Sequence, residues 1–333
     1  MAETPVRPRP RVSSSSRGLP VVLVASLQLL VTVGVLGFVV AWWGLEPITT
    51  ALGSLPWWAL AGGLVLGAAG VLVQALRWRL VARYHGIRLP VGPADVRCWQ
   101  ASFLNSLLPG GLAGDVLRAA DDSSDAEVSA GRRALASGFA AVAAERLCGT
   151  TVVLVAASAA LAPHRPLLAA LCLAGGVVTA TVAWRWLRRL PARDLLGVGM
   201  LSVVGWVAFA GIFALALVAV APSTDPRLAP GLAAVSIAGM SVPVGVGGWG
   251  TREAATAWIF SVVGLDPAAG VGVSVGYGVL ALVSTLPGAV VLAARLAPRV
   301  REVGRPRDGR RARAGPGAST PARRPAASLR SRA

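Results

Sequence analysis

The chain has 333 residues, of which 55% are hydrophobic and only 14% are charged, and its formal net charge is +17. Soluble domains carry charged side chains at about a quarter of their positions, so this composition excludes an ordinary soluble protein. The sequence contains no lysine, and its strongly basic residues are all arginines. A phosphate-binding P-loop and a Schiff-base site both need a lysine, so neither chemistry is expected.

Six apolar runs are long enough to cross a hydrocarbon core about 30 Å thick. They lie at residues 19–43, 57–76, 134–161, 166–186, 195–221 and 268–296. The first run is longer than the core of a signal peptide, which is about 7 to 15 residues, so it is expected to remain as an uncleaved span. The sequence therefore predicts an all-α, polytopic membrane protein.

Arginine is distributed unevenly among the segments that connect these runs. Four arginines precede the first run, four lie between Arg185 and Arg193, and eleven lie in the tail, whereas the loops around Arg165 and Arg227 hold one each. With six crossings, every arginine-rich segment falls on the same side. The positive-inside rule then predicts that both termini lie in the cytoplasm and that the protein spans the cell membrane.

The second run ends in the sequence Arg77-Trp78-Arg79. Tryptophan favours headgroup depth and arginine favours the cytoplasmic side, so these residues are expected at the membrane interface.

The boundaries of the runs divide the chain into three parts. Residues 1–19 are expected to be a disordered cytoplasmic segment, residues 20–296 a transmembrane domain, and residues 297–333 a disordered, arginine-rich cytoplasmic tail. The tail has too few apolar residues to build a core. Its charge favours contact with anionic lipid, although a topology signal without a regulatory role is the simpler interpretation.

Two further apolar segments, 99–108 and 232–242, are too short to cross the membrane, and another short stretch follows at 254–264. The breaks after them are rich in glycine: Gly110, Gly111 and Gly114 follow Pro109, and Gly245, Gly247, Gly248 and Gly250 follow Pro243. Such lengths favour half-helices or re-entrant segments. With six full spans, the two breaks enter from opposite sides, as they do in inverted-repeat transporters that bind substrate near the midplane.

Polar and charged side chains gather around the two breaks and inside the third run. They are Asn105, Asp115, Arg118, Glu145, Arg146, Trp249, Arg252 and Glu253. An ionisable group in a membrane segment is costly unless it is paired, so each is either a structural ion pair or a candidate site residue. Adjacent residues point about 100° apart on a helix, so Glu145 and Arg146 are expected to reach partners on other elements. The candidates are Arg118 or Asp115 for Glu145, and Glu253 or Asp115 for Arg146.

A helix start is expected after each glycine-rich break, with arginines close by. Backbone N–H groups at a helix start suit a phosphate, and arginine strengthens that preference. The abundant ligand of this kind in a bilayer is a phospholipid or a polyprenyl phosphate. We therefore expect membrane lipids, anionic ones preferred, as the partners. The spacing of Cys98, Cys148 and Cys172 gives no reason to expect a metal or a disulfide, and no cofactor or nucleic acid is expected.

These residues carry a family resemblance. The relevant stretches are Arg77-Trp78-Arg79, Phe103 to Pro109, Gly114 to Arg118, Glu145-Arg146, and Pro243 to Glu253. They resemble the recurring motifs of the lysylphosphatidylglycerol synthase transmembrane, or flippase-like, family, over about residues 20–296. The resemblance implies a membrane domain with re-entrant helices that moves lipids between leaflets. The sequence departs from the family at Ala113, where a glycine is common.

The function expected from this resemblance is translocation or binding of an anionic lipid without ATP hydrolysis. Family members can be fused to a soluble aminoacyltransferase, but no such domain follows residue 296 here, so no enzyme activity is expected and no catalytic residue is assigned. Two alternatives remain: a membrane subunit that presents a lipid to a separate glycosyl- or aminoacyl-transferase, and a secondary transporter of a small anion. An enzyme that works with carboxylates alone, such as Asp115 and Glu253, is a weaker alternative.

Overall fold

The computed structural model describes residues 44–108, 113–125, 132–241 and 248–303, together with seven positions, residues 30, 33, 34, 37, 38, 40 and 41. The chain divides into two units, Met1–Leu292 and Ala293–Ala333. Every regular element in the described residues is a helix. The protein is therefore all-α, as the sequence predicts.

Five helices in the described residues are long and apolar enough to cross a membrane. They are α3 (Trp57–Ala82), α6 (Arg132–Leu161), α7 (Pro166–Leu187), α8 (Ala192–Val220) and α11 (Pro267–Val303). These helices confirm five of the six predicted runs and make the chain a polytopic membrane protein. The remaining run, residues 19–43, lies mostly outside the described residues.

Two pairs of shorter helices flank the predicted breaks. The first pair is α4 (Val91–Leu107) and α5 (Ala113–Asp125), and the second is α9 (Ala229–Met240) and α10 (Thr251–Val262). At 1.5 Å per residue, α5, α9 and α10 are each about 20 Å long or less, which is short of a hydrocarbon core. The first predicted segment was too short, because α4 begins at Val91 rather than at residue 99.

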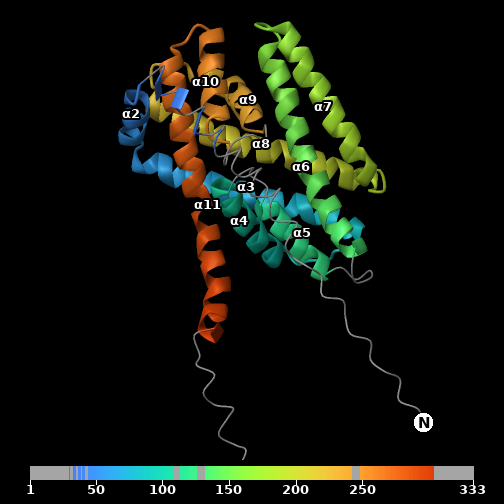
Figure 1. Cartoon of the computed structure of the whole chain (residues 1–333). Coiled ribbons are helices and arrows are strands. Elements are labelled where there is room, and N and C mark those ends of the chain that lie inside the picture. The colour runs from blue at the N-terminus through green and yellow to red at the C-terminus, as the bar shows by residue number, and fades with distance from the viewer. Residues whose placement is uncertain are drawn as a thin grey trace, which may run out of the picture. The chain divides into compact units, whose positions relative to one another are not determined.

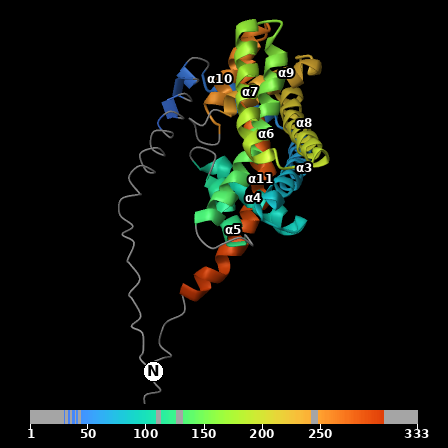
Figure 2. The same cartoon turned by 90° about the vertical axis from the view of Figure 1, so that its right-hand side faces the viewer.

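The two pairs lie toward opposite ends of α6. Figures 1 and 2 show α4 and α5 beside its lower part and α9 near its upper end. The packing agrees, because Ala157 and Leu161 of α6 share a core with Leu232 of α9. Ala144, nearer the start of α6, shares a different core with Cys98 of α4. Each end of α6 therefore holds one pair of short helices.

The segment between the first two predicted runs is not a plain loop, because it contains α2 (Glu46–Ser54). A proline and an acidic residue in the first turn both favour a helix start. Ala51 of α2 is fully buried against Val271 and Val275 of α11. Two 3₁₀ turns, η1 (Arg83–His85) and η2 (Pro226–Leu228), complete the connections.

Two of the three residues in the predicted interface sequence Arg77-Trp78-Arg79 are buried inside the protein. Helix α3 continues through this sequence to Ala82. Trp78 is 0% exposed and Arg77 is 9% exposed, so both lie in the interior. Burial of Arg77 is possible because Glu145 provides a counterion there.

Helix α11 continues past residue 297, the first residue of the predicted tail. Helix α11 runs to Val303, beyond residue 296. The residues that follow 292 are mainly Ala, Leu, Arg and Val, with no glycine before Gly304. Alanine, leucine and arginine favour a helix, which explains the continuation. Residues 304–333 lie outside the described residues.

Glycines allow α3 and α4 to approach α11 closely. A Cβ atom at Gly67 of α3 would lie 2.2 Å from Cβ of Ser284, and one at Gly288 would lie 2.2 Å from the backbone oxygen of Trp99 in α4. Close approach through small residues is typical of helix packing in membranes. These contacts fix α3 and α4 directly against α11.

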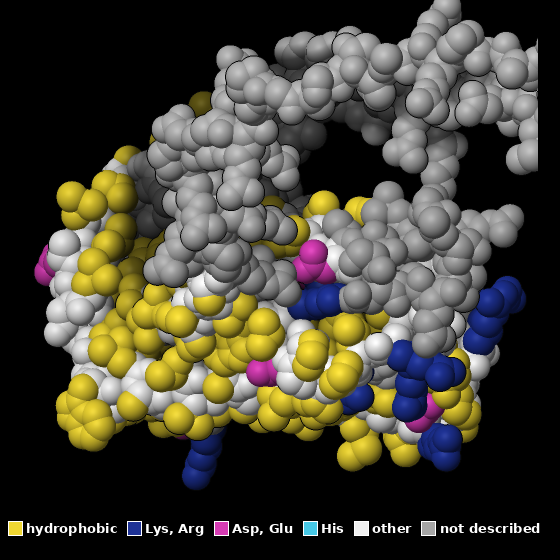
Figure 3. Space-filling view, turned by 90° about the horizontal axis from the view of Figure 1, so that it is seen from below, with side chains coloured by type: hydrophobic (Ala, Val, Ile, Leu, Met, Phe, Trp, Pro, Cys, Tyr) yellow, Lys and Arg dark blue, Asp and Glu magenta, His cyan; other side chains and the backbone are white. Residues whose placement is uncertain are grey.

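The outer surface is mainly apolar. Figure 3 shows hydrophobic side chains over most of the described part of one face, with arginines gathered toward one edge. On α7, Leu167 is 74% exposed and Val178 is 61% exposed. An apolar surface of this extent is expected to contact lipid.

We predict that Gly114→Ala destabilises the fold. A Cβ atom at Gly114 would lie 2.1 Å from the backbone oxygen of Ala101, so α5 would have to move away from α4. Overpacking of this kind costs about 1 to 3 kcal/mol, and the thermal unfolding midpoint in detergent should fall. The matched control is Gly199→Ala, because a Cβ atom there would meet nothing within 4 Å. Equal midpoints for both variants would contradict the prediction.

Candidate functional site

Asn105 joins the two helices of the first pair. Its Oδ1 atom accepts a hydrogen bond of 2.7 Å from the backbone N–H of Gly114, in the first turn of α5. Its Nδ2 atom donates to Asp115 Oδ2 at 3.2 Å. The side chain therefore satisfies an N–H group that a helix start leaves without an intrahelical partner, and it orients the Asp115 carboxylate.

Glu145 lies at the centre of a group of charged side chains from three helices. It is on α6 and is 0% exposed. Arg77 of α3 donates through Nε to Glu145 Oε1 at 2.9 Å, and Arg118 of α5 donates to the other oxygen, Oε2, at 3.0 Å. Arg77 also donates to Ser202 Oγ of α8 at 3.1 Å. Four helices are thus connected through one carboxylate.

Arg118 is fully enclosed and meets groups of several kinds. One of its terminal nitrogens lies 3.2 Å from Asp115 Oδ1, and the other donates to Cys98 Sγ at 3.1 Å. The Cys98 thiol is a weak acceptor. The guanidinium carbon lies 5.2 Å from the centre of the Trp78 ring, within the range of a cation–π contact.

Arg146 pairs with Asp115 from the side opposite Arg118. The adjacent residues Glu145 and Arg146 therefore reach Arg118 and Asp115 respectively, as their angular separation on the helix predicts. The Arg146 side chain is 39% exposed, whereas the Arg118 side chain is 0% exposed. Of these two arginines, Arg146 is therefore the one whose side chain reaches the surface of the group.

In this group, Trp78 Nε1 and Arg118 Nε are buried donors with no hydrogen-bond acceptor among the described residues. A buried donor without an acceptor costs about 1 to 3 kcal/mol. An anionic oxygen or an ordered water that reached them would recover that energy. We call the group Asn105, Asp115, Arg118, Glu145, Arg146, Arg77 and Trp78 the first site.

A second site surrounds Arg252 at the start of α10. Arg252 is 2% exposed, and its terminal nitrogen lies 2.6 Å from Glu253 Oε1. The other Glu253 oxygen accepts from the backbone N–H of Gly250 at 2.6 Å. Ser274 of α11 accepts from Arg252 Nε at 3.1 Å and donates to Glu253 Oε1 at 3.1 Å. The adjacent charged pair is therefore completed by a hydroxyl from another helix.

Aromatic rings enclose the Arg252 guanidinium. Its carbon lies 4.6 Å from the centre of the Trp249 ring and 5.3 Å from that of Tyr277. A Cβ atom at Gly278 would lie 2.3 Å from an Arg252 terminal nitrogen. Gly250 has a φ of +88°, a conformation that favours glycine, and it places Glu253 in the first turn of α10.

The structure thus divides the predicted site residues between two places. Asn105, Asp115, Arg118, Glu145 and Arg146 belong to the first site, and Trp249, Arg252 and Glu253 belong to the second. Of the predicted loop glycines, the structure describes Gly114, Gly248 and Gly250. The others, Gly110, Gly111, Gly245 and Gly247, lie outside the described residues.

Sequence reasoning missed several members of the two sites. Arg77 and Trp78 were assigned to the interface, and Ser202, Ser274 and Tyr277 were not considered. The chain has only two tyrosines, so a tyrosine inside a long apolar run was a usable signal. The serines gave no such signal in the sequence, because a single hydroxyl is common in membrane helices.

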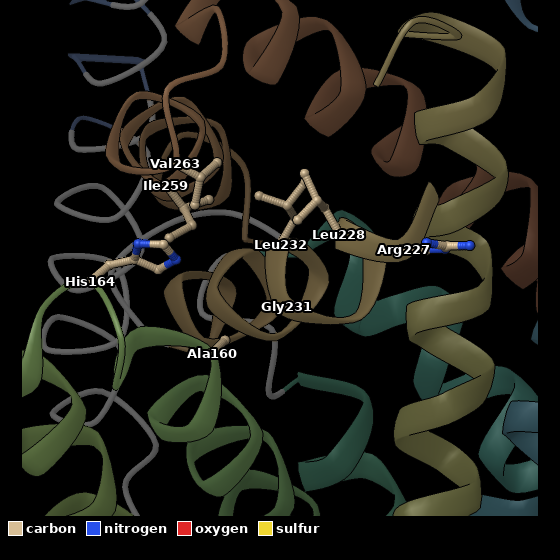
Figure 4. Close-up of a pocket in the computed structure, with 8 residues that line it drawn as sticks. All are labelled: Ala160, His164, Arg227, Leu228, Gly231, Leu232, Ile259 and Val263. Carbon is tan, nitrogen blue, oxygen red and sulfur yellow. The ribbon is translucent and has the colours of Figure 1, made fainter. Parts of the chain in front are cut away.

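A small pocket lies elsewhere, where the turn between α6 and α7 meets α9 and α10. Its volume is about 140 Å³, and its lining is mostly apolar: Ala160, His164, Arg227, Leu228, Gly231, Leu232, Ile259 and Val263. Figure 4 shows the His164 ring near Ile259 and the Arg227 side chain pointing away from the others. The two basic groups do not converge, so this pocket is not a candidate for an anion site.

The family comparison bears on the first site. Residues 25–195, just over half of the chain, match the model of the lysylphosphatidylglycerol synthase TM region. The chain belongs to this family. The resemblance predicted from the sequence is thereby confirmed, and the matched residues include all the members of the first site.

The family model matches no residue of the second site, because Trp249, Arg252 and Glu253 all lie after residue 195. No curated protein shows a significant match to the chain. The first site therefore lies within the part of the chain that matches the family model, and both sites are defined here by the geometry given above.

We predict that Glu145→Gln strongly destabilises the protein. The substitution keeps the shape of the side chain but leaves Arg77 and Arg118 without their shared negative charge in the interior. Breaking a buried ion pair costs about 3 to 5 kcal/mol, so the thermal unfolding midpoint in detergent should fall sharply. Glu46→Gln, at an exposed position on α2, is the control. A wild-type midpoint for Glu145→Gln would show that this carboxylate does not hold the helices together.

Proposed function

We propose that this protein binds the headgroup of an anionic phospholipid or polyprenyl lipid and moves it across the bilayer without hydrolysing a nucleotide. The observation that carries the proposal is the first site, where arginines and carboxylates are enclosed among helices of a membrane protein. Such groups are costly in a membrane, and they are retained in general where they serve a substrate path. Family membership supports the same conclusion.

The chemistry of the first site suits a phosphate. Arg118 and Trp78 each present a buried N–H donor that has no acceptor among the described residues. Arg146 offers a partly exposed guanidinium beside them. Arginine binds phosphate oxygens through a planar array of donors, and the acyl chains of a lipid can stay in the surrounding bilayer. We propose that Arg146 makes the first contact with the headgroup.

We further propose that the short helix pairs, α4–α5 and α9–α10, are re-entrant and enter from opposite sides. The support is their length and their position at opposite ends of α6. Such an arrangement would give each leaflet its own polar site. It also fits a transporter built from two inverted halves.

The protein is proposed to act in the cell membrane with both termini in the cytoplasm. The arginine-rich ends of α3 and α8 lie together, because Arg83 of η1 lies 2.7 Å from Asp194 Oδ2 in the first turn of α8. Tyr84 donates to the same oxygen. One end of the helices thus concentrates the arginines, which supports the positive-inside orientation.

The orientation can be tested with a reporter phosphatase that is active only outside the cytoplasm. The reporter should be inactive when it is fused after Val303 and active when it is inserted near His164. The reverse result would overturn this orientation.

We propose that the protein is not itself an enzyme. Asp115 and Glu253, the carboxylates that a hydrolytic mechanism would need together, belong to different sites and are each engaged by arginine. Presentation of a lipid to a separate transferase remains the main alternative, because it would use the same headgroup site without transport.

The test is exchange of fluorescent phosphatidylglycerol between leaflets of liposomes that contain the purified protein. Wild type should accelerate exchange, and Arg146→Gln should slow it by about ten- to a hundredfold, because a charge-assisted hydrogen bond contributes about 1.5 to 3 kcal/mol. Arg146→Lys should retain part of the activity. Arg165→Gln removes the same charge from an exposed position and should exchange lipid at the wild-type rate.

The other outcomes separate the alternatives. No exchange above empty liposomes, with several anionic lipids, would overturn transport and favour the transferase-partner function. Equal exchange of phosphatidylcholine would overturn the anionic preference. Release of a trapped small anion without lipid exchange would identify a small-anion transporter.

A further inference from the structure

Helix α11 contributes to the second site. Ser274 hydrogen bonds to both members of the charged pair Arg252 and Glu253. One turn later, the Tyr277 ring lies 5.3 Å from the Arg252 guanidinium carbon. Ser274 and Tyr277 are both 0% exposed. This part of α11 is therefore one wall of the second site.

The same helix reaches the edge of the first site. Thr285 Oγ1 of α11 lies 3.4 Å from Ser106 Oγ of α4. Each hydroxyl also lies 2.8 Å from a carbonyl oxygen of its own helix, Leu282 O and Phe103 O respectively. Ser106 follows Asn105, the residue that hydrogen bonds to Asp115. On α4, a further hydroxyl, Ser102, lies 3.4 Å from Gln74 Oε1 of α3. The hydroxyls of Ser106 and Ser102 thus form a series of polar groups on α4 that leads from α11 toward the first site.

The residues of α11 that face these sites form one stripe. Ser274, Ala281 and Thr285 are separated by seven and four positions, which places them on the same face of a helix. Eleven residues rise about 16 Å, roughly half the thickness of a hydrocarbon core. On the opposite face, Leu286 is 49% exposed and Val290 is 71% exposed. The helix therefore has a polar or small face toward the sites and an apolar face toward lipid.

We infer that this stripe of α11, defined as Ser274, Tyr277, Ala281, Ser284 and Thr285, is the surface along which a lipid headgroup passes between the two arginine sites. The inference rests on the proposed function. Burial of a polar headgroup without hydrogen bonds is costly, and the hydroxyls of the stripe can donate as well as accept. Neutral hydroxyls also bind a phosphate more weakly than arginine does, so the headgroup can leave them again.

In the described conformation the stripe is largely enclosed, because Ser274, Tyr277 and Ser284 are buried, whereas Ala281 and Thr285 are half-buried. Ser284 is 4% exposed and lies against Gly67 of α3, where a Cβ atom would approach to 2.2 Å. The contact of Gly288 with Trp99 brings α4 equally close. A headgroup can therefore pass Ser284 only when α11 separates from α3, and the proposed path includes this movement.

The first experiment locks α4 to α11. In the double variant Ser106→Cys/Thr285→Cys, the two new sulfurs replace hydroxyl oxygens that lie 3.4 Å apart, which is close enough for a disulfide after a small adjustment. Oxidation should abolish exchange of fluorescent phosphatidylglycerol, and reductant should restore it. Each single cysteine variant, treated in the same way, controls for the native cysteines and for oxidation elsewhere.

The second experiment removes one hydroxyl without a lock. Thr285→Val keeps the shape of the side chain, and exchange should slow roughly three- to tenfold, the rate equivalent of one hydrogen bond. The matched control is Thr181→Val on α7, where the exposed hydroxyl bonds only its own helix at Val177 in the described contacts. The control should exchange lipid at the wild-type rate.

The outcomes distinguish the path from the function. If wild type itself does not exchange lipid, the proposed function fails. If wild type exchanges lipid but the oxidised double variant keeps the wild-type rate, lipid transport stands and the α11 path is overturned. A wild-type rate for Thr285→Val also overturns the path.

Discussion

A carboxylate enclosed in a membrane protein must meet positive charge, and Glu145 meets two arginines. Because Arg77 and Arg118 come from different helices, this requirement joins α3, α5 and α6, and Ser202 adds α8. Hydrophobic burial cannot select such an arrangement in a bilayer, where lipid chains are as apolar as leucine. The ion pairs therefore define which faces of the helices meet. The rest of the first site follows from that choice, since Arg118 then lies on Trp78 and beside Asp115.

The second site also pairs an enclosed carboxylate with an arginine, but it uses fewer helices. Arg252 and Glu253 are adjacent in sequence, so the pair needs no second helix to neutralise it. The backbone of Gly250 and the hydroxyl of Ser274 use the remaining hydrogen-bonding capacity of Glu253. The first site depends on four helices, whereas the second depends on the start of α10 and one wall of α11. Movement of α11 would therefore change the second site directly and the first site through α3 and α4, which both contact α11.

Some of this architecture was predictable from the sequence for clear physical reasons. The long helices follow from the length of the apolar runs, because a membrane span needs about twenty apolar residues. The partners of Glu145 and Arg146 follow from the angle between neighbouring positions on a helix. The burial of Arg77 could not be predicted in this way, since its partner Glu145 lies 68 residues away and local hydropathy does not report which way a helix is turned. Helix α2 was missed for a related reason, because its single buried alanine becomes informative only against α11.

The second site is sensitive to substitution of Gly278. The Arg252 side chain occupies the space that a methyl group at residue 278 would need, so alanine there would displace the guanidinium from between Trp249 and Tyr277. Arg252 would remain in the chain, but its guanidinium would lose its contacts with the two aromatic rings. A change from one small apolar residue to another at this position would therefore disrupt the arrangement of the second site. A comparison that followed only the charged residues would count such a protein as intact.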